Sequence, residues 1–196
     1  EFFDIRNVFE EFFSVNLDLF QCLSHISPTF RFFKKLKSTL NADLSENYYT
    51  ILEKCVEKID RENSTHLNAD RVGRKELTQR LYDIDKSILL HYLKNPQEND
   101  YELISILSSP THPMDPKMRS RRNLSFASKF CHYACMLIFE GEIEQDNFSI
   151  YDNIVCKNLH HYANYYHLSL PKDYKSSYQS YIALIDNIIS ASGNEI

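Results

Sequence analysis

Apolar side chains recur every three to four positions along most of this chain, which is the period of an amphipathic α helix. Leu77, Leu81, Ile84 and Ile88 illustrate the pattern, because a helix would place all four on one face. Every periodic segment follows this spacing, so the pattern predicts an all-α protein. The predicted helices span residues 1–26 (as one helix or two), 30–40, 45–59, 70–92, 101–107, 123–139, 152–166 and 174–190.

Prolines separate several of these segments. Pro28 ends the first helical stretch, Asn95-Pro96 ends the long segment that Asp70 opens, and Pro171 precedes the last helix. The longest predicted loop, residues 108–118, contains three prolines. A loop of this length in a helical domain is either a plain connector or a functional element that wedges or covers a substrate.

The composition fits one helical domain. The chain has 196 residues, 43% of them hydrophobic, with 13 Phe and 13 Tyr but only 3 Gly and 6 Pro. No apolar run reaches the roughly 18 residues of a membrane span, and the first residues are acidic, unlike a signal peptide. The 5 cysteines are odd in number and lie in apolar contexts, which favours buried thiols in a reducing, cytoplasmic compartment.

The net charge of the chain and its local clusters of charge lead to different expectations. A net charge of −5 argues against a nonspecific polyanion-binding protein. Basic residues nevertheless gather before the predicted helix 123–139, at Lys117, Arg119, Arg121 and Arg122. Because local charge decides phosphate binding, this cluster predicts contacts to a nucleic-acid backbone.

Two residues that follow this cluster, Lys129 and Asp152, have side chains that could cleave a glycosidic bond. Asp152 stands at a predicted helix start, where free backbone N–H groups and the helix dipole favour a carboxylate. Such a carboxylate can stabilise an oxocarbenium-like transition state or activate a water. Lys129, near the start of the preceding helix, could attack C1′ of a sugar if its pKa is lowered. An ordinary helix cap is the simpler interpretation of Asp152.

The stretch from Asn123 to Asn153 resembles the helix-hairpin-helix DNA glycosylases, in particular the 8-oxoguanine-glycosylase-like bacterial proteins. In that family a hairpin leads into a helix that can carry a catalytic lysine, and a Pro/Ile-x-Asp segment then places the essential aspartate at the next helix start. Ser125–Lys129 matches the first part and Ser149–Asp152 the second. The chain departs from the family in lacking hairpin glycines and the downstream iron–sulfur cysteine cluster.

The resemblance implies a single-domain DNA glycosylase over residues 1–196, with N-terminal helices in about 1–60 and a glycosylase-like core in about 70–190. It would act as a monomer without cofactor or metal on duplex DNA that carries a modified base, in repair or anti-phage defence. The base would be oxidised guanine or a hypermodified phage base. The implied site residues are Asp152 and Lys129 for catalysis, Lys117, Arg119, Arg121, Arg122, Asn123 and Ser125 for DNA binding, and Phe126, His132 and Tyr151 for the base pocket.

Two alternatives belong to other functional classes. Arg61 and His66 fit the R-x4-H pattern of HEPN-type ribonucleases, which are also all-helical. A non-catalytic module that holds a protein partner through aromatic helix faces is the other alternative. Cys131 and Cys135, with His160 and His161, could be metal ligands, but buried structural cysteines explain the pattern better.

Overall fold

The structure is a computed structural model that describes residues 28–41, 47–62, 65, 67, 72–110 and 123–193. The described residues form helices and no strands, which confirms the all-α prediction. The predicted helix 1–26 lies outside them, as does Ser45, the first residue of the predicted helix 45–59. The helices are α2 (Pro28–Leu40), α3 (Tyr48–Glu62), α4 (Val72–Tyr82), α5 (Lys86–Lys94), α6 (Glu102–Ser108), α7 (Leu124–Ile138), the 3-10 helix η1 (Ile143–Asp146), α8 (Asn153–Tyr165) and α9 (Tyr178–Ala191). Among the described residues, no helix has the length and apolarity required to cross a bilayer.

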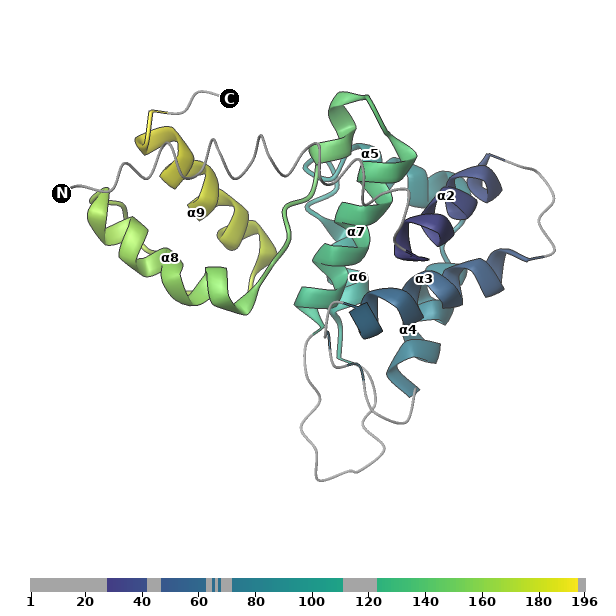
Figure 1. The fold of residues 1–196 in the computed structure, drawn as a ribbon. Coiled ribbons are helices and arrows are strands. Elements are labelled where there is room, and N and C mark those ends of the chain that lie inside the picture. Colours follow the sequence, from purple (N-terminus) through teal and green to yellow (C-terminus); the bar gives the residue numbers. More distant parts are fainter. Residues whose placement is uncertain are drawn as a thin grey trace.

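α7 is the central helix. It is apolar on nearly all sides, as expected for a helix buried by its neighbours. Phe130 is fully buried and lies against Phe33 of α2, with ring centroids 5.5 Å apart, and against Phe126 one turn earlier. Figure 1 shows α2 to α6 gathered around one side of α7, with α8 and α9 on the other side.

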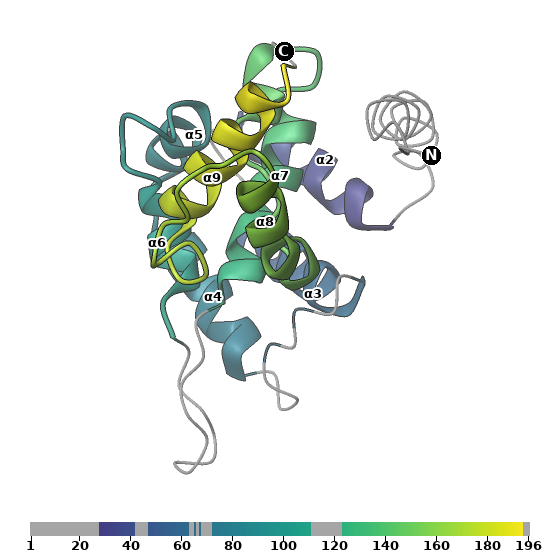
Figure 2. The same ribbon diagram turned by 90° about the vertical axis from the view of Figure 1, so that its left-hand side faces the viewer.

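α8 and α9 both begin beside the segment that follows η1. Asp152 ends that segment and caps α8, while Tyr178 and Tyr181 in the first turns of α9 donate hydrogen bonds back to it. Turned by 90°, the ribbon shows these two helices in front of α7 (Figure 2). The segment between η1 and α8 therefore lies where α7, α8 and α9 meet.

The single helix predicted over residues 70–92 is wrong, because the chain forms two helices there. Asp85 caps α5, and its carboxylate accepts the backbone N–H of Ser87 at 2.8 Å. The break rotates the buried face, so Leu89 and Leu93 are inside while Ile88 is 46% exposed. A capping aspartate therefore overrides an apolar period that would fit one long helix.

The last helix begins four residues later than predicted. Ser177 caps α9 by accepting the N–H of Ser180 at 3.3 Å, and the preceding residues form turns. Tyr174, the predicted first residue, is buried from a turn rather than from a helix. The serine cap, which the apolar period does not reveal, sets the start.

Candidate functional site

Two side chains of α7 hold the segment that leads to Asp152. Ser128 Oγ accepts the backbone N–H of Tyr151 at 2.9 Å and donates to the carbonyl of Ser125 at 3.2 Å. One turn further along α7, Nδ1 of His132 lies 2.7 Å from the carbonyl oxygen of Phe148. Since a carbonyl only accepts, Nδ1 carries the proton. The α7 side of the segment is thus fixed at both of its ends.

Two tyrosines of α9 hold the same segment from the other side. Tyr178 Oη donates to the carbonyl of Ser149 at 2.6 Å, and Tyr181 Oη donates to the carbonyl of Ile150 at 2.9 Å. When the bonds of Ser128 and His132 are included, the backbone of each of residues 148–151 forms one hydrogen bond with a side chain. We call residues 148–151 the clamped segment. Such second-layer contacts are what keep a reactive side chain in one position.

Asp152 follows the clamped segment and caps α8, as predicted. Its backbone is extended, with φ −125° and ψ 138°, and Oδ1 accepts the N–H groups of Ile154 at 2.7 Å and Val155 at 3.4 Å. The carboxylate consequently sits at the positive end of the α8 dipole. Its position is compatible with a plain structural cap and with a catalytic carboxylate that is held in place.

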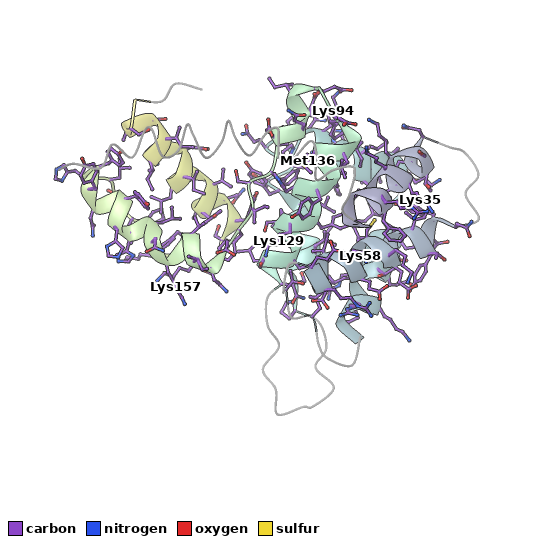
Figure 3. All side chains as sticks on the ribbon, in the orientation of Figure 1. Lys35, Lys58, Lys94, Lys129, Met136 and Lys157 are labelled. Carbon is purple, nitrogen blue, oxygen red and sulfur yellow. The ribbon has the colours of Figure 1, made fainter. Side chains whose placement is uncertain are left out.

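Lys129 lies next to Ser128 on α7 and is only 9% exposed. Burial lowers the pKa of its ammonium group, while the charge of Asp152 acts in the opposite direction. The two side chains predicted to be catalytic are thus within electrostatic reach of each other, although 23 positions separate them in the chain. Figure 3 shows Lys129 on the part of α7 nearest to α8. A lowered pKa increases the neutral amine fraction that a nucleophilic lysine needs.

The three residues predicted to line a base pocket have structural contacts. Phe126 is in the core against Phe130, and Tyr151 is buried with its hydroxyl donating to the carbonyl of Lys175 at 3.0 Å. Burial lowers the pKa of His132, which favours the neutral ring. A hollow of about 160 Å³ lies elsewhere, between α6 and the starts of α7 and α9. The role of Phe126, His132 and Tyr151 in base binding stays a prediction.

The residues predicted to bind DNA are only partly described. Lys117, Arg119, Arg121 and Arg122 lie outside the described residues. Asn123 donates its backbone N–H to the carbonyl of Ser108 at 3.0 Å, so the described parts of the chain before and after residues 111–122 meet there. Asn123 and Ser125 are half-buried at the start of α7. Lys129 follows Asn123 by six residues, which span about 9 Å in a helix. The contact between Asn123 and Ser108 is therefore close to Lys129.

The R-x4-H pattern lies only partly within the described residues. Arg61 forms an ion pair with Glu57 at 2.9 Å in the last turns of α3, and His66 lies outside the described residues. The buried neighbour of Arg61, Asp60, organises the described part of this region. Its carboxylate accepts hydrogen bonds from the hydroxyl of Thr65, the N–H of Leu67 and the guanidinium of Arg74.

The candidate metal ligands are separated. Cys131 and Cys135 are buried within α7, where burial raises the pKa of both thiols. The rings of His160 and His161 lie side by side on α8 in a tilted arrangement, with centroids 3.7 Å apart. No group of three or more His, Cys, Asp or Glu side chains in the described ranges converges as a metal site would require.

Sequence reasoning proposed Asp152 and Lys129 as site residues and gave no site role to Ser128, Tyr178 or Tyr181. The hydroxyls of these three residues contact backbone 23 to 31 positions away, and no local pattern signals such contacts. Comparisons of the chain with protein-family models, curated proteins and solved structures find no match.

Proposed function

We propose that this protein is a DNA glycosylase that turns a modified base out of duplex DNA and cleaves its N-glycosidic bond. The observation that carries the proposal is that Lys129, a buried lysine whose pKa is lowered by burial, lies within electrostatic reach of Asp152, a carboxylate held at a helix start. The resemblance of residues 123–153 to the helix-hairpin-helix glycosylases supports the same assignment.

Asp152 acts on the charge that develops on the sugar. As the bond between C1′ and the base breaks, the ring becomes oxocarbenium-like, and a nearby carboxylate stabilises that positive charge. The same carboxylate can accept a proton from an attacking water. The clamped segment supports this role because it limits how far Asp152 can move away from the sugar.

Lys129 assists as a nucleophile. Its neutral amine attacks C1′ while the base leaves with the electron pair of the broken bond and takes up a proton. Asp152 accepts a proton from the attached amine. The C1′–O4′ bond then opens, O4′ is protonated, and an iminium (Schiff base) remains between Lys129 and the sugar. If water attacks instead, the same carboxylate activates it and no covalent adduct forms.

DNA binding is assigned to the basic cluster that precedes α7. Lys117, Arg119, Arg121 and Arg122 would hold phosphates, which fixes the register on the duplex without selecting sequence. Turning the nucleotide out of the stack costs a few kcal/mol, about what a fitted pocket returns. Oxidised guanine and a hypermodified phage base are the two substrate classes that we propose.

The test is base release from a panel of duplexes that carry oxidised guanine, glucosylated hydroxymethylcytosine, other modified bases or no modification. We expect the protein to release one class and to leave the unmodified duplex intact. If the folded protein releases no base from any of these duplexes, the proposed function is wrong.

A further inference from the structure

The outer face of α8 is apolar, aromatic and uncovered. Its largest exposed side chains are Ile154 (73% exposed), Tyr165 (69%), Val155 (45%) and Tyr162 (38%). At 100° per residue these four fall within an arc of about 100° around the helix. The buried residues Cys156, Leu159 and Ala163 fall about 40–100° further around the helix than this arc, against the rest of the protein. We call these four residues, with Asn158 and His161 between them, the outer face of α8.

This region differs in charge from the rest of the chain. Residues 153–172 contain no Asp or Glu, whereas the whole chain has a net charge of −5. Lys157 and Lys172 are exposed there, together with the exposed rings of His161 and His167. Figure 3 shows Lys157 on the side of α8 that is turned away from α9. Between Asp152 and Asp173, the outer face therefore offers aromatic and apolar contacts with no carboxylate among them.

We propose that the outer face of α8 binds an unpaired stretch of nucleic acid, one strand of a duplex that has opened beside the flipped nucleotide. This inference rests on the proposed glycosylase function. Tyrosine rings that stack on bases, bordered by positive charge, are how proteins hold single strands without sequence preference. α8 begins directly after Asp152, so a strand whose sugar reaches that carboxylate meets Ile154 and Val155 next.

The dimensions of α8 fit a short strand. The twelve residues from Ile154 to Tyr165 are separated by eleven steps and span about 17 Å along the helix axis. That length corresponds to about five nucleotides at 3.4 Å each. Tyr162 and Tyr165 lie at the far end of this path, where they would stack on bases several positions from the flipped nucleotide.

The experiment is fluorescence anisotropy of the full chain with a labelled 12-nucleotide single strand, at fixed salt. A double variant, Tyr162→Leu with Tyr165→Leu, keeps helix propensity and apolar bulk but removes both rings. We expect it to bind at least about tenfold more weakly. Tyr165→Phe keeps the ring and should bind as the unmodified protein does. Ile143→Ser is the matched control, because Ile143 is highly exposed but lies on η1.

Three results would overturn the inference. The first is no binding of the single strand by the unmodified protein, and the second is unchanged binding by the double variant. The third is a dimer, seen by sedimentation, that the double variant dissolves, since the face would then belong to a second copy. The assay does not use excision, so it separates the two proposals. Loss of strand binding by the double variant supports this surface even if no base is released.

Discussion

Ser128 Oγ accepts the backbone N–H of Tyr151 at 2.9 Å, and this one hydrogen bond joins the residue before Lys129 to the residue before Asp152. Each proposed catalytic residue thus directly follows one of the two residues that form this hydrogen bond. Ser128 is fully buried, so a lost bond cannot be replaced by bulk water. The distance between the lysine and the aspartate depends on this contact between α7 and the clamped segment.

Ser128→Ala tests that dependence. The N–H of Tyr151 would be buried without an acceptor, which costs about 1–3 kcal/mol of unfolding free energy. Base excision should fall as well, because Asp152 would no longer be held in place. Urea denaturation and single-turnover excision measure the two effects. Ser38→Ala is the control, since its exposed hydroxyl only donates to Lys34 within α2. Equal stability of both variants would contradict this role of Ser128.

The burial of Lys129 predicts a dependence of stability on pH. Because its folded pKa lies below the unfolded value near 10.4, the unfolded chain binds more protons between those two values. The free energy of unfolding contributed by Lys129 therefore rises with pH through this window. Lys129→Met should be more stable than the unmodified protein at neutral pH, with an advantage that shrinks toward pH 10.5.

Chemical denaturation from pH 6 to pH 10 measures this difference. Lys157→Met, at an exposed position of α8, is the control and should show no comparable pH dependence. A Lys129→Met protein that is less stable at every pH would show that the amine contributes favourable contacts that outweigh its desolvation. A stability cost at the lysine would match the general observation that active sites are kept at the expense of stability.

Borohydride trapping tests the covalent step. The reagent reduces an iminium to a stable amine, so the unmodified protein should form a DNA adduct that resists denaturing electrophoresis. Lys129→Ala should form none while keeping part of its base release, because water can replace the amine. Lys75→Ala, at an exposed position of α4, should be trapped normally. Trapping of the Lys129→Ala protein would assign the nucleophile to a different amine.

Part of this site could be predicted from the sequence, and the reason differs between residues. The Asp152 cap is a local feature, visible as an aspartate before an apolar helical pattern. The proximity of Lys129 to Asp152 followed only from the resemblance, because no helical period relates two different helices. The tyrosine contacts of α9 depend on how three helices meet, and Asp85 divides what the apolar spacing presents as one helix.

We expect the buried Asp60 to contribute much of the stability of the N-terminal part of the described chain. Asp60→Ala should cost about 3–5 kcal/mol, because Arg74 would lose its buried partner and Thr65 and Leu67 their acceptor. Glu57→Ala, which removes only surface ion pairs to Lys54 and Arg61, should cost less than about 1 kcal/mol. Urea denaturation compares them, and similar losses for both would refute the buried network.

The most direct test of the central claim compares Asp152→Asn with Asp85→Asn. Both aspartates cap helices, α8 and α5, and asparagine caps about as well, so both variants should melt close to the unmodified protein. The measurement is the rate of base release from the modified duplex that the unmodified protein cleaves. We expect Asp85→Asn to retain full activity and Asp152→Asn to lose about 10²–10⁴-fold, since an amide neither stabilises the sugar cation nor accepts a proton. Full excision by a folded Asp152→Asn protein would contradict the mechanism and leave Asp152 as a helix cap alone.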